Sequence, residues 1–206
     1  KCMENALKAP TSSNLQVWEI YWIRTKKKKN KVIKACLSQP AASTAKELFV
    51  FVSRPDYWKR NNQLMLDYFK TRNNVPKEVY NYYTKLTSLT YNHGFLGILG
   101  FFKKIIVNII GMFKVIPREP TSFAEMKVWS QKTTALACQN FMLSMRAYGF
   151  DSCPMEGLDS TRMKKILNLP RKAQICMAIG TGKRENRGIY GKQLRFVHKR
   201  LVVAQI

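Results

Sequence analysis

Histidine and cysteine are scarce in this 206-residue sequence, and those present are scattered. The two histidines, His93 and His198, are too few for a multi-histidine metal cage. The five cysteines are odd in number and include no Cys-x-x-Cys pair, which argues against both a zinc site and a disulfide framework. We therefore expect no metal ion, a reducing cytoplasmic setting, and a structural or surface role for His198.

Long apolar runs and targeting signals are also missing. No stretch of about 18 or more residues is purely apolar, so the sequence predicts no ordinary transmembrane helix. Lys1 opens a polar segment that does not resemble a secretory signal, and no Gly-x-Gly-x-x-Gly turn of the dinucleotide-binding kind occurs. Residues 2–7 read as the middle of a helix, and we expect an upstream segment before them.

Acidic residues are few. Asp and Glu number 12 against 36 Lys and Arg, which gives a net charge of +24. Such an excess attracts polyanions, whether nucleic acid, an anionic membrane surface or a phosphorylated dinucleotide such as NADPH. Charge alone does not choose among them, and a solvated surface without a dedicated partner is the favoured interpretation. No nucleic-acid-binding signature accompanies the charge, so we expect no specific nucleic-acid partner.

A hydrophobic share of 46% is enough for one core at this length, so we expect a single domain over residues 1–206. Periodicity predicts strands at 17–24, 48–53 and 173–179, with 201–206 as a last strand or a C-terminal arm. It predicts helices at 1–9, 31–39, 56–72, 77–91, 122–148 and 160–169, and the four lysines 26–29 read as a solvated turn. The alternation of helices and strands predicts an α+β (α/β-like) fold.

Two short segments carry polar groups suited to a ligand site. Residues 10–18 (PTSSNLQVW) join the first helix to the first strand through hydroxyls and carboxamides. Residues 153–159 (CPMEGLD) follow the long helix, and their Pro-x-Glu-Gly turn can set N–H groups and one carboxylate against a ligand edge. Taken singly, each is more simply explained as an ordinary turn, with Asp159 capping the next helix.

Together the two segments resemble the motifs of the nitroreductase-like family of FMN-dependent NAD(P)H oxidoreductases. That family carries Pro-Ser-Ser-x-Asn-x-Gln-Pro-Trp early in the chain, a long central helix similar to residues 129–140, and then Pro-x-Glu-Gly-Phe-Asp. Residues 167–170 (LNLP) and 178–180 (AIG) resemble its later helix end and strand end. The resemblance implies a nitroreductase-type fold, in which a central, mostly antiparallel sheet is flanked by helices, and a homodimer with the flavin between subunits.

The resemblance also implies a set of FMN-binding residues, some contributed by the partner subunit. Gln39 is a looser match to an amide near the polar edge of the flavin. Lys192 and Arg195 resemble C-terminal cations that hold the FMN phosphate, although plain surface charge is a rival explanation in so basic a chain. The predicted cofactor-binding residues are Pro10, Thr11, Ser12, Asn14, Gln16, Gln39, Pro154, Met155, Glu156, Gly157, Lys192 and Arg195.

In this interpretation the flavin carries the chemistry, and the protein supplies position and electrostatics. The resemblance implies that NAD(P)H, as co-substrate, passes hydride to flavin N5 with Glu156 nearby. An electron-poor acceptor such as a nitroaromatic or a quinone then replaces it in a ping-pong cycle, and no side chain is expected to be catalytic itself. Two alternatives stay open: a flavin-fold binding protein without redox turnover, and a basic membrane-surface or nucleic-acid-binding protein.

The sequence departs from the family pattern in several places. No Arg-x-Ser-x-Arg segment, which grips the phosphate in the family, precedes the first motif, and Val17 and Leu158 replace the usual Pro and Phe. Residues 56–120 match no family motif and are expected to form a variable helical insertion or lid. Within them, residues 95–114 predict a helix with glycines and lysines on one side and a broad apolar side opposite. A lid or dimer-contact helix is favoured, and peripheral membrane contact stays open.

Overall fold

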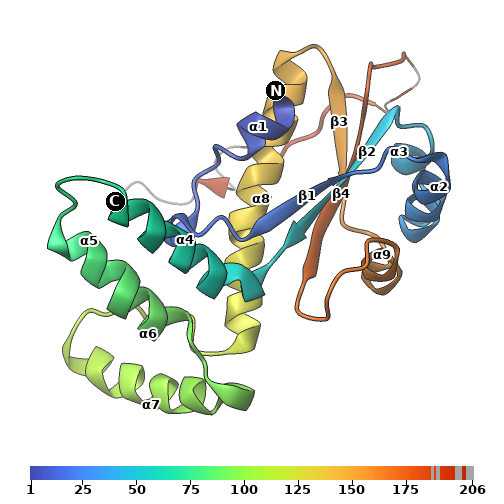
Figure 1. Ribbon diagram of the computed structural model, residues 1–206. Coiled ribbons are helices and arrows are strands. Elements are labelled where there is room, and N and C mark those ends of the chain that lie inside the picture. The colour runs from blue at the N-terminus through green and yellow to red at the C-terminus, as the bar shows by residue number, and fades with distance from the viewer. Residues whose placement is uncertain (187, 189–190, 198–200, 203–206) are drawn as a thin grey trace.

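The computed structural model describes residues 1–186, 188, 191–197 and 201–202. Its centre is a four-stranded antiparallel sheet with the strand order β1-β2-β4-β3 (Figure 1). The strands are β1 (Trp18–Trp22), β2 (Glu47–Ser53), β3 (Asp151–Met155) and β4 (Gln174–Gly182). β2 is buried from Leu48 to Ser53, which confirms the prediction of a strand covered on both faces.

Helix α8 (Phe123–Ala147) covers one face of the sheet (Figure 1). Its Phe141 is fully buried, and the centre of its ring lies 4.7 Å from that of Phe49 and 5.4 Å from that of Phe51, both on β2. The short helix α1 (Cys2–Ala6) packs along α8, where the Asn5 amide donates a hydrogen bond to the Ser144 hydroxyl at 2.9 Å. Aromatic contacts therefore hold α8 to the sheet.

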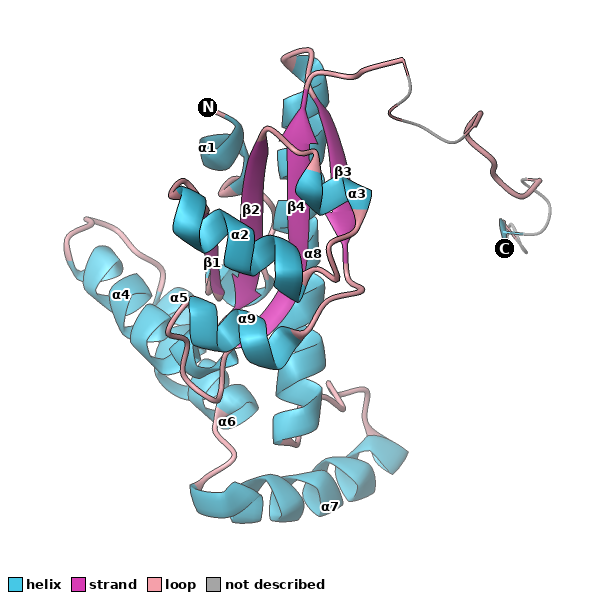
Figure 2. Ribbon diagram, turned by 90° about the vertical axis from the view of Figure 1, so that its right-hand side faces the viewer, coloured by secondary structure: helices cyan, strands magenta, loops and turns pink. Residues whose placement is uncertain are grey.

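Three shorter helices cover the opposite face (Figure 2). They are α2 (Lys26–Ala35), α3 (Pro40–Ser43) and α9 (Ser160–Ile166). Val32 of α2 and Met163 of α9 are fully buried in one cluster with Val50 of β2. Helices on both faces of an antiparallel sheet confirm the predicted α+β class.

The segment between β2 and α8 forms the helical insertion expected over residues 56–120, and it lies beside and below the sheet in Figure 1. It contains the 3-10 turn Pro55–Tyr57, α4 (Trp58–Lys70), α5 (Lys77–Asn81), the π-helical turn Tyr82–Leu86, α6 (Thr87–Tyr91), the 3-10 turn Phe95–Gly97 and α7 (Ile98–Phe113). The helix expected over 77–91 is thus divided by a π-helical turn. By length and composition alone, Phe95–Phe113 could cross a membrane. No such helix was predicted from the sequence, because this segment contains lysines and is not purely apolar.

Local sequence signals set several element ends. The Ser122 hydroxyl accepts a hydrogen bond from the Glu125 N–H at 3.2 Å, which confirms the Ser122 half of the predicted capping box, whereas the Glu125 carboxylate accepts from Thr121 and not from the Ser122 N–H. Gly149 has φ +78°, so it closes this helix in the left-handed conformation as expected. The Asp159 carboxylate accepts from the Arg162 N–H at 2.9 Å and caps α9.

Two local predictions were wrong. The lysines 26–29 form the first turn of α2 and not a solvated turn, because Thr25 caps the helix and lysine is a good helix former. Pro154 and Met155 belong to strand β3, although the sequence suggested a turn there. β3 is an edge strand, and an edge strand tolerates the missing N–H of a proline. Leu201 and Val202 are not in a strand, and residues 203–206 lie outside the described residues.

We expect Phe141→Ala to lower the free energy of unfolding by about 3–5 kcal/mol, because it leaves a cavity between α8 and β2. Urea unfolding of purified protein measures this. Phe113→Ala, at a position 82% exposed, is the matched control and should stay within about 0.5 kcal/mol of the parent. Equal losses in the two variants would contradict the role of Phe141 as the contact that holds α8 to the sheet.

Candidate functional site

The connection between α1 and β1 holds the first predicted ligand segment in a strained backbone conformation. Leu15 and Val17 are fully buried, whereas the polar Asn14 and Gln16 are exposed. Ser13, Asn14 and Gln16 have φ values of 54°, 50° and 46°. Each non-glycine residue in this left-handed region costs roughly 1–3 kcal/mol, and such strain is characteristic of binding sites. The buried residues therefore anchor a loop whose polar side chains point outward.

Tyrosines from the insertion hold this loop in place. The Tyr83 hydroxyl donates to the Ser13 carbonyl oxygen at 3.1 Å. The Tyr91 hydroxyl lies 2.9 Å from the Ser13 hydroxyl and 3.3 Å from the Ser12 hydroxyl. The strained loop thus depends on α6 and the π-helical turn, more than 65 residues further along the chain.

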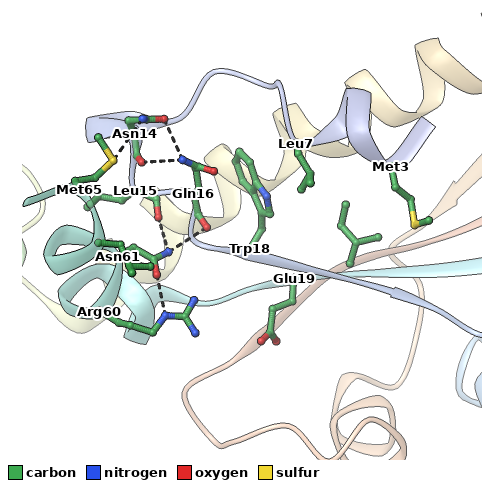
Figure 3. A pocket seen from close by; sticks show the side chains of 12 residues that line it. Met3, Leu7, Asn14, Leu15, Gln16, Trp18, Glu19, Arg60, Asn61 and Met65 are labelled. Carbon is green, nitrogen blue, oxygen red and sulfur yellow. Dashed lines mark hydrogen bonds between the residues drawn. The ribbon is translucent and has the colours of Figure 1, made fainter. Parts of the chain in front are cut away.

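Asn61 of α4 holds the end of the same loop from below (Figure 3). Its side chain is buried and donates to the carbonyl oxygens of Leu15 at 2.6 Å and Gln16 at 3.3 Å. The Arg60 guanidinium donates to the Asn61 amide oxygen at 2.8 Å and so fixes its orientation. The Gln16 amide nitrogen in turn lies 3.3 Å from the Asn14 side-chain oxygen, which aligns two of the predicted site residues.

A pocket of about 490 Å³ opens between this loop, α1, β1 and α4 (Figure 3). Its polar lining comes from Asn14, Gln16, Glu19, Arg60 and Asn61. Its apolar lining comes from Met3, Leu7, Leu15, Trp18, Ile20, Leu64 and Met65. The hollow is open to solvent, and the side chains of Asn14 and Gln16 lie at its rim.

Arg54 carries an ion network at the wall of this region. The side chain is 8% exposed, and its guanidinium lies 2.8 Å from Glu19 and 2.8 Å from Asp56. Burial raises the pKa of Glu19, but hydrogen bonds from Tyr57, Arg54 and Tyr21 outweigh it, so its pKa lies below the ordinary 4.5. The pKa of Asp56 likewise lies below 3.8, because its bonds to Arg54 outweigh burial. Both carboxylates therefore stay charged.

The second predicted segment lies at the end of β3, and Gln39 joins it. The Gln39 amide donates to the Gly157 carbonyl oxygen at 3.0 Å, so the structure brings together two predicted site residues that are far apart in sequence. Pro154, Glu156 and Gly157 are exposed, whereas Met155 is buried in the core. A Cβ atom added at Gly157 would meet nothing within 4 Å, so the space over this glycine is open.

The two segments do not meet within one chain. The loop 10–16 leads into β1, and residues 154–157 end β3, and these strands are the two edges of the sheet. Three strand spacings of about 4.8 Å separate the edges by about 14 Å. The structure therefore groups Asn14 with Gln16, and Gln39 with Gly157, as two separate half-sites.

The predicted phosphate-binding cations lie in a third place. Lys192 and Arg195 are exposed, in a segment that runs away from the sheet after β4 (Figure 2). Within the described residues, the Arg195 guanidinium bonds only to the neighbouring Leu194 carbonyl oxygen, at 2.7 Å. A single chain thus does not join them to either half-site, and His198 lies outside the described residues.

The profile of the Nitroreductase family matches residues 1–183. The chain belongs to the nitroreductase family. Protein DrgA of Synechocystis sp. (strain ATCC 27184 / PCC 6803 / Kazusa) is 26% identical over 184 residues, which are 89% of this chain and 71% of DrgA.

Solved structures show the same fold. A candidate nitroreductase of Bacillus subtilis, ydfN, superimposes with a TM-score of 0.73 at 20% identity, over 98% of this chain and 84% of ydfN. A candidate nitroreductase of Exiguobacterium sibiricum in complex with FMN has a TM-score of 0.66 at 17% identity, over 100% of this chain and 83% of that one. The resemblance in the motifs and the predicted nitroreductase-type fold are both confirmed.

Sequence reasoning missed the residues that support the site in this nitroreductase-family chain. Asn61, Tyr83, Tyr91 and Arg54 lie in or beside the insertion, where no family motif was recognised. The concentration of tyrosine in residues 77–91 was the one available signal, since tyrosine carries an apolar ring and a hydroxyl that seeks a partner.

We expect the free energy of unfolding to fall as the pH drops below about 4.5. Glu19 and Asp56 have depressed pKa values in the folded protein, so they stabilise it above their ordinary pKa and lose this effect as the pH falls through the lower folded values. Glu19→Gln should lower stability at neutral pH by about 1.5–3 kcal/mol, because it breaks bonds to a charged group. It should also make the acid decline shallower in urea unfolding at several pH values.

Glu4→Gln is the control for this experiment, because the Glu4 side chain is 76% exposed. It should leave both the neutral-pH stability and the acid decline close to those of the parent. An acid decline in Glu19→Gln as steep as the parent's would refute the Arg54 network as its source.

Proposed function

We propose that this protein is an FMN-dependent oxidoreductase that works as a homodimer with two equivalent, shared flavin sites. The observation that carries the proposal is the separation of two exposed polar half-sites at opposite edges of one sheet. A planar ligand that used both would need the loop 10–16 of one subunit and residues 154–157, at the end of β3, of another. A two-fold axis would generate two such sites.

The available groups fit a flavin mononucleotide. The exposed carboxamides of Asn14 and Gln16 can donate and accept, as the carbonyl and N–H edge of a flavin ring requires. The open space over Gly157 accommodates a flat ring against the backbone. Lys192 and Arg195 are exposed cations of the kind that hold a phosphate, and the Arg fork can bind it bidentately.

FMN, when bound, supplies the exchange of two electrons between NAD(P)H and an electron-poor acceptor such as a nitroaromatic or a quinone. The chain's own residues bind and orient it. Gln39 fixes the turn through its bond to Gly157, and Asn61 fixes the Asn14 and Gln16 loop through the carbonyls of Leu15 and Gln16. On one side we assign Pro10, Thr11, Ser12, Asn14 and Gln16, and at the phosphate Lys192 and Arg195. On the other side we assign Gln39, Pro154, Glu156 and Gly157, together with Met155, whose side chain is buried in the core and which offers only its backbone.

We expect NAD(P)H and the acceptor to occupy one opening in turn, in a ping-pong cycle. The sequence offers no Gly-x-Gly-x-x-Gly turn for a separate dinucleotide site, which supports a shared opening. The free cysteines support a reducing, cytoplasmic setting. A flavin-binding protein without redox turnover remains the second candidate, and NAD(P)H oxidation separates the two.

The purified protein, reconstituted with excess flavin, is expected to hold FMN and to reject FAD. Gly157→Val should abolish FMN binding without loss of stability, because a side chain there meets nothing in the subunit itself and enters the ligand space. Chromophore release on denaturation identifies the flavin, and visible absorbance titration measures the affinity. FAD in the released material, or full FMN binding by Gly157→Val, would overturn this assignment.

A complementation experiment tests the shared sites. Asn14→Gly removes a carboxamide and keeps the left-handed backbone that glycine adopts freely, and Gly157→Val blocks the other half-site. Each variant alone is expected to bind little FMN. Refolded together in equal amounts, they form mixed dimers with one intact site of two, and about one quarter of the parent's FMN sites return.

Sedimentation of the parent at low micromolar concentration, with flavin absorbance followed, completes this test. We expect a dimer that carries the flavin signal. A monomer with stoichiometric FMN, or a mixture of variants with no recovered sites, would contradict the shared architecture, even if the protein proved to be a flavoenzyme.

A further inference from the structure

Helix α7 turns its small and charged side toward the protein and its apolar side outward. Gly100 is its one buried residue among those the structure describes, and the half-buried positions continue the same side. Together with the preceding turn, the inward-facing residues are Gly97, Gly100, Lys103, Val107 and Gly111. A surface helix of a globular protein ordinarily does the opposite and buries its apolar stripe.

Specific contacts fix this orientation. A Cβ atom added at Gly100 would lie 2.4 Å from the Thr121 carbonyl oxygen, so close an approach admits only glycine. The Lys103 ammonium donates to the carbonyl oxygens of Thr90 at 2.6 Å and Leu89 at 3.3 Å. The close contact of Gly100 and the hydrogen bonds of Lys103 thus hold the first half of α7 against the protein.

Arg118 holds the second half. Its guanidinium donates to the carbonyl oxygens of Val107 at 3.0 Å and Asn108 at 3.3 Å, and it also reaches the Gly111 carbonyl oxygen. A Cβ atom at Gly111 would collide with this guanidinium. Because polar contacts fasten both halves, α7 cannot roll its apolar side inward without breaking them.

The outward side is a continuous apolar stripe. Ile98, Phe102, Ile105, Ile109 and Phe113 recur at helical spacing and are 43 to 82% exposed. In the most apolar 18 residues of Phe95–Phe113, 6% of the residues are buried. Soluble proteins rarely expose an apolar patch beyond a few hundred Å², so this stripe requires an apolar environment.

We propose that α7 lies flat in the interfacial layer of an anionic lipid bilayer, with its apolar stripe among the acyl chains and its basic flanks at the headgroups. Charge complementarity selects this partner. The chain carries a net charge of +24, and three exposed basic residues lie on α7 or soon after its end: Lys104, Lys114 and Arg118. Basic residues near an anionic surface strengthen binding to it. An anionic lipid surface attracts so basic a chain.

Length and connection favour a flat helix over a span. Phe95–Phe113 has enough residues to cross a membrane, but its first three form a separate 3-10 turn with a non-helical Leu96. The 16 residues of α7 measure about 24 Å, less than a hydrocarbon core of about 30 Å. The chain reaches α7 from α6 and continues from it into α8, so both ends of α7 are tied to the rest of the protein. The inward contacts run along both halves of α7. Both views show α7 as the outermost layer at one end of the molecule, where a plane can reach it (Figures 1 and 2).

Vesicle co-sedimentation tests the proposal on the full chain. The probes are vesicles of phosphatidylcholine alone and of phosphatidylcholine and phosphatidylglycerol in equal amounts. The parent is expected to sediment with the anionic vesicles and much less with the neutral ones. Phe102→Asp should weaken binding to the anionic vesicles about tenfold or more, because it removes a large apolar side chain from the interface.

Leu37→Asp is the matched control, with the same charge change at a position 69% exposed and away from α7. It should bind nearly as the parent does, and thermal unfolding checks that both variants fold. A parent that stays in solution with anionic vesicles would overturn the proposal. So would equal binding by Phe102→Asp and Leu37→Asp, which would mean attraction by charge alone. A dimer that Phe102→Asp dissociates, without vesicle binding, would instead make α7 an interface between copies.

Discussion

The buried guanidinium of Arg54 holds together the three parts of the chain that build the first half-site. The backbone N–H of Arg54 donates to the carbonyl oxygen of Val17, directly before β1, at 2.8 Å. Its side chain binds Glu19 on β1 and Asp56 at the start of the insertion. An unpaired charge at this depth would be strongly destabilising, so the carboxylates and the guanidinium depend on one another. The insertion is thereby fixed against the edge of the sheet.

Every later contact to the loop follows from that attachment. With α4 fixed, Asn61 reaches the Leu15 and Gln16 carbonyl oxygens, and Tyr83 and Tyr91 reach Ser12 and Ser13. These bonds offset the conformational cost of three left-handed residues, which an isolated loop would not bear. The variable insertion is therefore part of the support of the candidate site, because its side chains hold the loop that carries Asn14 and Gln16.

The sequence was enough to predict the elements whose signals are local. β2 is a short apolar run, α8 opens with a capping box and ends at Gly149, and both gave the expected element. The motifs named the residues of both half-sites, and the structure brings Asn14 to Gln16 and Gln39 to Gly157, while their part in FMN binding stays a prediction. The supports of the loop could not be predicted, because Asn61 and Tyr83 act on residues 46 and 70 positions away. The turn predicted at residues 26–29 was wrong because the charge of four lysines indicates only that the segment is exposed. An exposed segment can form either a helix or a turn.

The same short helix supports both the loop and α7. In α6, the Tyr91 hydroxyl contacts the Ser13 hydroxyl. The carbonyl oxygen of the preceding residue, Thr90, accepts a hydrogen bond from the Lys103 ammonium group. Adjacent residues thus hold a strained ligand loop and a helix whose apolar side faces outward. Gly100 of α7 also lies against the Thr121 carbonyl oxygen directly before α8, so α6 and the start of α8 together fix the position of α7.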